Sequence, residues 1–423
     1  MSKAVWIKHA SQLVTLASKH KGPRTKEAMS ELTIIEDGSI WLENEVIQAI
    51  GTTEELQRKY ATRIDEAEII DAFGKLVTPG LVDPHTHVAY GGSREREFEM
   101  RLEGATYMDI MNAGGGIHAT SRMTREATEE EIFAQTKVRL DSFLAHGVTT
   151  IEGKSGYGLN VETEIKQLRV MQRLQTEHPV DIVPTFMGAH AVPAEFKEKE
   201  DEYVDLIVND MLPKVAGEKL AKFNDVFCEV GVFTPEQSKR ILEAGKALGL
   251  APKIHADEIE PYGGAELAAE VGAISAEHLL KASDSGIAAM AKQGVIACLL
   301  PATALYLRET SARGRAMIDA GVPVAISTDC NPGSSPTTSM PLVMNLACIS
   351  MRLTPAESLC AATFNAACAI QMEDKVGSLE IGKQADIVLW NVPNYQQLQY
   401  LFGVNHVNSV WKKGVQVVGL QRN

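Results

Sequence analysis

Two histidines separated by one residue are the first sign of chemistry in the sequence. They lie in Pro84-His85-Thr86-His87, near the end of the apolar segment Gly80–Val88. If this segment is a β-strand, His85 and His87 point to the same face, because strand side chains alternate with a period of two. Two imidazoles on one face can hold one metal ion. Alone, the motif is weak, since such pairs arise by chance in many chains.

Other titratable residues follow β-rich segments further along the chain. His255 lies in Ile-His-Ala-Asp-Glu, His278 in Ser-Ala-Glu-His-Leu and Asp329 in Ile-Ser-Thr-Asp-Cys. Zinc or ferrous iron accepts a set of three imidazoles and one carboxylate, with water completing the coordination. We therefore predict one metal ion held by four ligands: His85, His87, His255 and Asp329.

Two further residues near these strand ends are candidates for catalysis. Glu258 follows His255 by three residues, so its carboxylate could take a proton from a metal-activated water and pass it to a leaving nitrogen. His278 could stabilise a substrate oxygen as it becomes anionic. The alternatives are a solvated loop carboxylate for Glu258 and, for His278, a metal ligand or a hydrogen-bond partner of Asp329.

A second metal ion is an open alternative. Glu229, in Phe-Cys-Glu-Val-Gly-Val, could bridge two ions. No lysine or additional ligand accompanies it on that strand, which favours a single ion. Glu152 and Lys154 lie near the end of another strand and are expected to support the pocket.

Glycine-rich segments are expected to form the loops around the site. The run 112–117 contains three adjacent glycines, but it lacks the GxxxxGK[ST] pattern of a phosphate loop, so we expect a long loop over the site. Arg94 and Tyr157 lie on two other glycine-containing segments. An arginine at the mouth of the site could bind a substrate carboxylate, and its alternative is an ion pair with a nearby glutamate.

The elements that position these residues alternate between strands and helices. Eight strand–helix units in about 250 residues predict an α/β fold, a (β/α)8 TIM-like barrel, in which the carboxyl ends of the strands line the active site. A doubly wound sheet is the alternative, but no GxGxxG follows an early strand. The expected strands are Gly80–Val88, Val148–Glu152, Asp181–Met187, Asp225–Val232, Pro252–Ala256, Ala273–Glu277, Val295–Leu300 and Pro323–Ser327.

The two ends of the chain differ from this middle part. Both contain short β-type runs separated by turns, so we predict a small β-sandwich domain built from both chain termini. The predicted boundaries are 1–78 for its N-terminal part, 79–380 for the barrel and 381–423 for its C-terminal part. The periodic segments Glu129–His146, Val161–Glu177, Pro235–Leu248 and Ser283–Gln293 predict barrel helices.

Composition narrows the possible partners. The chain has 423 residues and a net charge of −14, with no Lys/Arg run, which disfavours nucleic acid because phosphate backbones are anionic. No apolar run approaches the ~20 residues that cross a bilayer, so we expect no membrane interaction. The N-terminus lacks the pattern of a secretory signal, which predicts a cytoplasmic protein. The six cysteines form no CxxC pair and are expected to be buried, reduced thiols.

Taken together, these motifs resemble those of the amidohydrolase superfamily, and most closely those of its imidazolonepropionase family. LVTPGLVDPHTHV enters the barrel and VGSLEIGKQADIVLWN leaves it, so the resemblance covers nearly the whole chain. The segments TIEGKSGYGL, TFMGAHAVP, KIHADEIE and ISTDCNPGSSPT follow the family's order. They are far more specific together than His-x-His alone, and these positions show no departure from the family's pattern.

The resemblance implies hydrolysis of an anionic small molecule, 4-imidazolone-5-propanoate, to N-formimidoyl-L-glutamate. It implies one Zn²⁺ or Fe ion, acid–base catalysis by Glu258 with Asp329, and stabilisation of the carbonyl oxygen by His278. Arg94 would bind the propanoate carboxylate. The other substrate contacts that it implies, besides Glu258, are Tyr157, His190, Asn331, Gly333 and Ser334. We also expect a homodimer.

Two other functions are compatible with parts of this pattern. Deaminases of purine or pyrimidine rings share the metal ligands, but their substrates carry no carboxylate for Arg94. A metal-free scaffold protein on the same fold would need to have lost ligands that are all present here.

Overall fold

One of the two eight-stranded sheets is a barrel of parallel strands, within the residues that the structure describes: 4–18, 21–105, 109–110 and 113–419. In this computed structural model the strands are neighbours in chain order from β6 to β13. Their bounds are β6 (Leu81–Thr86), β7 (Val148–Lys154), β8 (Asp181–Ala189), β9 (Phe223–Cys228), β10 (Ala251–Ala256), β11 (Ser275–His278), β12 (Ile296–Leu299) and β13 (Val324–Ile326).

The first and last strands meet and close the barrel. Thr86 forms a parallel bridge with Cys330, and the His87 N–H donates to the Cys330 carbonyl over 2.9 Å. Deeper in the barrel, the Asp83 carboxylate accepts hydrogen bonds from the Ser327 and Thr328 hydroxyls. The predicted (β/α)8 barrel is therefore confirmed, and the doubly wound alternative is wrong.

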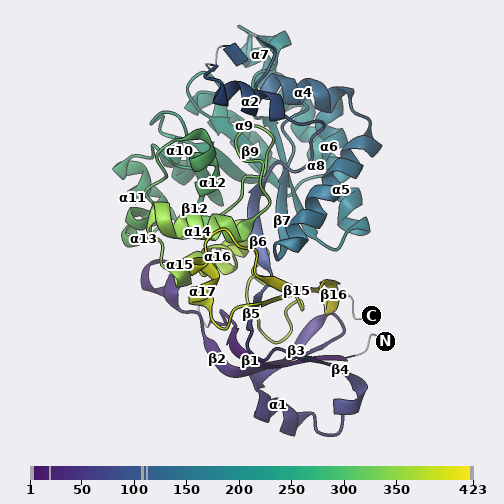
Figure 1. Ribbon diagram of the computed structural model, residues 1–423. Coiled ribbons are helices and arrows are strands. Elements are labelled where there is room, and N and C mark those ends of the chain that lie inside the picture. The colour runs from purple at the N-terminus through teal and green to yellow at the C-terminus, as the bar shows by residue number, and fades with distance from the viewer. Residues whose placement is uncertain (1–3, 19–20, 106–108, 111–112, 420–423) are drawn as a thin grey trace.

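Helices surround the barrel, as Figure 1 shows. The four helices predicted from periodicity are found within one residue of their expected bounds: α5 (Glu129–Ala145), α6 (Val161–Glu177), α9 (Pro235–Ala247) and α11 (Asp284–Gln293). Capping fixes where they begin. Thr128 and Thr234 each accept the backbone N–H three residues later, and that residue's side chain returns the bond.

Two segments differ from the expected pattern. The strand predicted over Asp225–Val232 is shifted to Phe223–Cys228, because the chain turns at Glu229, whose carbonyl accepts the Val232 N–H. The described part of the loop expected after the first barrel strand includes the helices α2 (Glu95–Leu102) and α4 (Ile117–Glu126). Of its glycine-rich run, Asn112 lies outside the described residues.

Strands from both ends of the chain form the second sheet, as predicted for a small β domain built from both termini, and all eight of its described strands belong to this one sheet. β5 (Leu76–Pro79) lies between β1 (Ala4–Val14) and β14 (Ile387–Trp390), so it joins the N-terminal and C-terminal strands. This domain lies below the barrel in Figure 1, with both termini beside it. Its other strands are β2 (Ile34–Glu43), β3 (Val46–Thr52), β4 (Ala67–Asp71), β15 (Val407–Lys412) and β16 (Val415–Val418). The exact domain boundaries stay a prediction.

A buried ion cluster connects the two domains. Lys412, on β15, lies 2.6 Å from carboxylate oxygens of both Asp181, the first residue of β8, and Asp386. Burial raises the pKa of Asp181, but Lys412 outweighs burial and holds that pKa at about 2. The ammonium group is thus shared between the barrel and the small domain.

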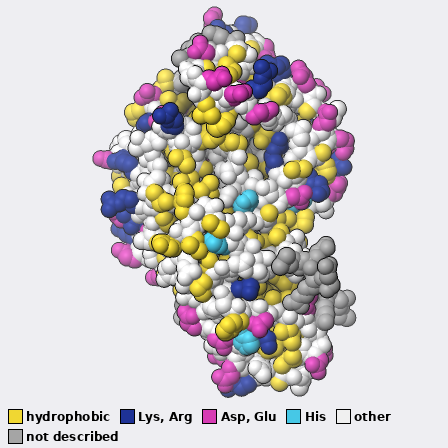
Figure 2. All heavy atoms as spheres, in the orientation of Figure 1, with side chains coloured by type: hydrophobic (Ala, Val, Ile, Leu, Met, Phe, Trp, Pro, Cys, Tyr) yellow, Lys and Arg dark blue, Asp and Glu magenta, His cyan; other side chains and the backbone are white. Residues whose placement is uncertain are grey.

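Surface features agree with the composition. Figure 2 shows lysines and arginines scattered among aspartates and glutamates over the face that it draws. Among the described residues, no helix is both long enough and apolar enough to cross a membrane. All six cysteines are free thiols, of which five are buried and Cys348 is half-buried.

Candidate active site

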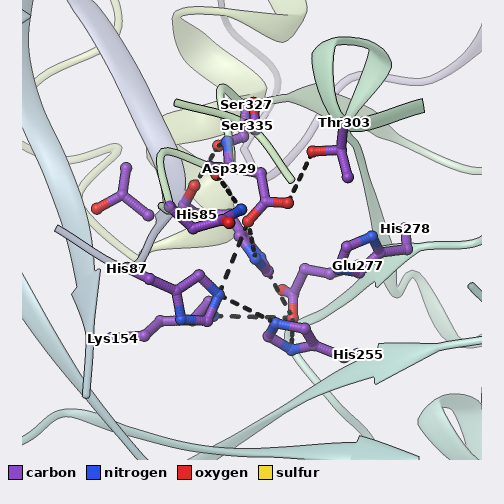
Figure 3. Close-up of polar contacts among 12 residues, drawn as sticks. His85, His87, Lys154, His255, Glu277, His278, Thr303, Ser327, Asp329 and Ser335 are labelled. Carbon is purple, nitrogen blue, oxygen red and sulfur yellow. Dashed lines mark hydrogen bonds and ion pairs between the residues drawn. The ribbon is translucent and has the colours of Figure 1, made fainter. Parts of the chain in front are cut away.

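Three histidines from two strands converge inside the mouth of the barrel. His85 and His87 lie at the end of β6 and just beyond it, and His255 lies on β10. The Nε2 atoms of His87 and His255 are 3.3 Å apart. Oδ1 of Asp329, which follows β13, lies 3.3 Å from Nε2 of His85 and 3.7 Å from Nε2 of His87. Figure 3 shows this convergence, which brings all four predicted ligands together.

The donor set suits a metal ion. Ligand atoms of His85, His87 and His255 all lie within 4.8 Å of one another. Both ring nitrogens of His85 and Nδ1 of His87 are buried without a hydrogen-bond partner among the described residues, although buried polar atoms normally have one. Burial lowers the pKa of both rings well below the usual value, so they are neutral and offer lone pairs to a cation.

His278 lies beside this ligand set. One of its ring nitrogens lies within 4.8 Å of ligand atoms of His85 and Asp329, and its Nδ1 lies 3.5 Å from the Glu258 carboxylate. Burial lowers the pKa of His278 as well. The geometry therefore suits both a neutral donor to a substrate oxygen and a further ligand.

Glu258 borders the cavity in an environment that suits proton transfer. Burial raises the pKa of its carboxyl to about 8, and the neighbouring carboxylates of Asp329 and Glu229 act in the same direction. A carboxyl that titrates near neutral pH can both accept and return a proton. Asp329, which accepts a 2.7 Å hydrogen bond from the Thr303 hydroxyl, has its pKa raised by burial to about 7.

The backbone is strained where two of these residues lie. Asp329 has φ = 52° and His278 has φ = 69°, in the left-handed region that non-glycine residues rarely adopt. Such strain persists only where surrounding contacts enforce it, and it is common at active sites.

Beneath the histidines lies a network of fully buried charges. Nζ of Lys154 lies 2.7 Å from Asp225 and 2.9 Å from Glu152, while Nζ of Lys253 lies 2.6 Å from Glu152. Burial alone would raise the pKa of Asp225, but Lys154 and His255 outweigh it and hold that pKa well below its usual range. Asp225 is therefore an anion deep inside the barrel.

This network fixes the orientation of the His255 ring and approaches that of His85 without bonding to it. Nδ1 of His255 lies 3.1 Å from Oδ1 of Asp225, and Nδ1 of His85 lies 3.8 Å from Oε2 of Glu277. A carboxylate that accepts the Nδ1–H of His255 leaves Nε2 free to coordinate a metal ion. The sequence did not predict roles for Asp225, Lys253 and Glu277, although Lys253 precedes His255 by two residues and thus shares its inward face.

We predict that Asp225→Asn weakens metal binding by about 10- to 100-fold, because the neutral amide raises the basicity of His255 less than the carboxylate does. The affinity is measured by titrating stripped protein with metal against a competing chelator. Asp141→Asn is the matched control, since Asp141 lies 3.1 Å from Nε2 of His178 away from the site. Equal metal affinities for wild type and Asp225→Asn would contradict this role.

A cavity of about 290 Å³ opens above the ligand cluster. Besides Glu258, its lining includes all the residues that are expected to contact a substrate: Arg94, Tyr157, His190, Asn331, Gly333 and Ser334. His87, His255, His278 and Asp329 border the same cavity. A molecule in this cavity would therefore contact the ligand cluster.

His190 packs against the ligand cluster. Its ring stacks on that of His87, with centroids 4.6 Å apart, and its Nδ1 lies 3.0 Å from the Gly156 carbonyl oxygen. Gly156 has φ = 104°, and a Cβ there would lie 2.9 Å from Nδ1 of His190, so only glycine fits. Burial and the neighbouring His255 lower the pKa of His190 to about 3.

The loop after β13 is held by its own hydrogen bonds. The N–H groups of Gly333 and Ser334 donate to Oδ1 of Asn331 over 2.8 Å, and Nδ2 of Asn331 donates to Oγ of Ser334 over 2.9 Å. Asn331, Gly333 and Ser334 all line the cavity.

Arg94 fits both of the roles that the sequence left open, an arginine at the mouth of the site and an ion-pair partner of a glutamate. It lines the cavity, and its Nε and Nη2 also donate to Oε2 of Glu97 over 2.9 and 2.6 Å. The other oxygen of Glu97 accepts the Gly116 N–H over 3.1 Å, which fastens the glycine-rich segment next to the cavity.

Glu229 has a different role from the one considered for a second metal ion. Its carboxylate accepts the backbone N–H groups of Glu258 and Ile259 over 3.1 and 2.9 Å. It thereby holds the loop that carries Glu258, and it belongs to none of the potential metal clusters among the described residues. This geometry favours a mononuclear site.

Known proteins resemble this chain over nearly its whole length. Residues 76–417 match the model of the amidohydrolase family. The chain is 65% identical over 418 residues to the imidazolonepropionase of Brevibacillus brevis, covering 99% of each chain. It is 63% identical over 416 residues to that of Geobacillus kaustophilus, covering 98% of each, and 53% identical over 410 residues to that of Clostridium tetani, covering 97% of each.

Solved structures share the fold at much lower identity. Guanine deaminase of E. coli superposes with a TM-score of 0.74 at 14% identity, covering 100% of each chain. A 5-methylcytosine deaminase from Klebsiella pneumoniae gives 0.73 at 14% identity, covering 99% of each chain. At such identities the likeness concerns the fold alone.

Proposed function

Because the chain belongs to the amidohydrolase family and to the imidazolonepropionases within it, we propose that it hydrolyses 4-imidazolone-5-propanoate to N-formimidoyl-L-glutamate. This reaction is the third step of histidine degradation. The observation that carries the proposal is the 65% identity to an imidazolonepropionase over 99% of both chains. The cavity supports it, since its lining combines groups suited to an anionic side chain with groups suited to hydrolysis.

We propose that one zinc or iron ion is held by His85, His87, His255 and Asp329. Such an ion would polarise the ring carbonyl and lower the pKa of a water molecule to about 7. Neither ligand type distinguishes zinc from iron, because imidazole and carboxylate bind both metals.

The protein's own residues would move the proton. The water oxygen adds to the ring carbonyl carbon while Glu258, together with Asp329, accepts the water proton. His278 donates a hydrogen bond to the carbonyl oxygen as negative charge develops there. The ring C–N bond then breaks, Glu258 returns the proton to the leaving nitrogen, and the former carbonyl becomes the α-carboxylate of the product.

The remaining cavity residues would bind and orient the substrate. Arg94 takes the propanoate carboxylate, while Tyr157 and His190 line the wall beside it. Three residues in the loop after β13 would hold the imidazolone and, after ring opening, the formimidoyl group. They are Asn331, Gly333 and Ser334. A homodimer in the cytoplasm stays a prediction made from the sequence.

Replacing Arg94 tests the substrate class. Arg94→Ala is expected to raise KM by about 10- to 100-fold with little change in kcat, because the lost bond to the carboxylate is present before and during the reaction. Steady-state kinetics with the imidazolone substrate measure both constants. An unchanged KM would contradict the contact between Arg94 and the carboxylate. The alternative would then be deamination of a ring that has no carboxylate, which ammonia release from guanine or cytosine would reveal.

A further inference from the structure

The cavity contains a second arginine that neither the motifs nor the resemblance selected. Arg101 lies on α2, seven residues after Arg94, with Glu97 between them. Glu97 and Arg101 are four residues apart and share one face of the helix, and Arg94, the residue just before the helix, donates to Glu97. Arg94 and Arg101 both line the cavity.

The two arginines differ in charge balance. Arg94 gives two N–H groups to Glu97, so this pair adds no net charge to the cavity wall. Arg101 has no carboxylate within ion-pair distance among the residues that the structure describes. Its Nη2 donates to the Gly333 carbonyl oxygen over 3.1 Å, and its Cζ lies 5.9 Å from the centre of the Tyr306 ring. Arg101 therefore supplies the uncompensated positive charge.

Both guanidinium groups approach the same glycine. A Cβ on Gly333 would lie 2.2 Å from Nη1 of Arg94, so the missing side chain makes room for that group. Arg101 contacts the carbonyl of the same residue. An anion beside Gly333 would meet Nη1 of Arg94, which makes no bond to Glu97, and also the remaining N–H groups of Arg101.

We propose that Arg101 is a second carboxylate-binding residue, and that its charge makes the site prefer substrates with an anionic side chain. The inference rests on the proposed function, which supplies the propanoate group. A buried carboxylate needs an opposite charge to offset its lost hydration. Arg94 is already neutralised by Glu97, so the preference depends on Arg101.

The test compares binding of two stable probes to the metal-loaded enzyme. Imidazole-4-propanoate and imidazole-4-propanamide share a ring and a chain length, and they differ in charge. Their dissociation constants are measured by calorimetry for wild type, Arg101→Met and Arg101→Lys, alongside KM and kcat for the imidazolone substrate. Arg96→Met is the matched control, because Arg96 is exposed on the opposite face of α2.

Arg101→Met is expected to weaken binding of the propanoate by about 10- to 100-fold and to change binding of the amide by less than about threefold. Arg101→Lys should recover part of the loss, and Arg96→Met should match wild type. Equal weakening of both probes would indicate a structural role and overturn the proposal, as would an unchanged preference. If the wild-type enzyme fails to hydrolyse the imidazolone, the proposed function is wrong. If the wild-type enzyme hydrolyses it and Arg101→Met still prefers the propanoate to the amide, only this inference is wrong.

Discussion

Glu258→Gln is expected to lower kcat by about 10²- to 10⁴-fold while leaving the metal content unchanged. Glutamine keeps the size and shape of the side chain but cannot take a proton from water or return it to the leaving nitrogen. The carboxyl of Glu258 is suited to both steps because burial raises its pKa to about 8. Its side chain is outside the four predicted ligands, so metal binding should persist.

The measurement is steady-state turnover together with elemental analysis of the same protein sample. Glu260→Gln is the matched control, since Glu260 is exposed two residues further along the same loop. It should behave as wild type. Near-normal turnover of Glu258→Gln would remove Glu258 from proton transfer, and loss of metal would make it a ligand or a support of one.

Removing the metal is expected to reduce turnover by about 10³-fold or more, and adding zinc or iron should restore it. Free water has a pKa of 15.7, so without an ion almost no hydroxide is available at neutral pH. The chain's own residues at the site would remain, but they would act on an unactivated water. His87→Ala should have the same effect, because its Nε2 lies among the converging ligand atoms.

Activity is measured on chelator-treated protein during titration with each metal. The proposed mononuclear site predicts full recovery at about one equivalent per chain. His9→Ala serves as the control for histidine loss, because His9 lies in the small domain, where its Nδ1 is 3.4 Å from Asp71. Full turnover of metal-free protein would contradict the metal-dependent account.

Much of the ligand set could be predicted because two simple rules act together. Strand alternation places His85 and His87 on one face, and a parallel barrel gathers the carboxyl ends of its strands at one mouth. His255 and Asp329 follow from the second rule alone. Neither rule needs knowledge of which strands are neighbours, since all eight ends meet in the same place.

The buried charges beneath the ligands could not be found in this way. Asp225 was expected to be the first residue of its strand, and a charge at a strand end is ordinarily solvated. The strand begins two residues earlier, which carries Asp225 inside the barrel next to Lys154. Its role depends on a partner 71 residues away in the sequence, and no local pattern reveals that pairing.

The two arginines of the cavity show a different reason for incomplete prediction. The sequence predicts a loop after the first barrel strand, and in a loop the spacing of residues does not indicate which side chains share a face. Because Glu95–Leu102 is a helix, Glu97 and Arg101 share one face, and Arg94, just before the helix, bonds to Glu97. Arg94 could be predicted as an arginine near glycines. The roles of Glu97 and Arg101 become evident only when the helix places them on one face.

The most direct test of the whole account is a turnover assay with freshly generated 4-imidazolone-5-propanoate on purified protein of measured metal content. Guanine and cytosine are offered in parallel reactions. We expect N-formimidoyl-L-glutamate to appear, with about one zinc or iron ion per chain and no ammonia from either base. Ammonia from a base without hydrolysis of the imidazolone would contradict the substrate assignment and leave only the barrel and its ligand cluster.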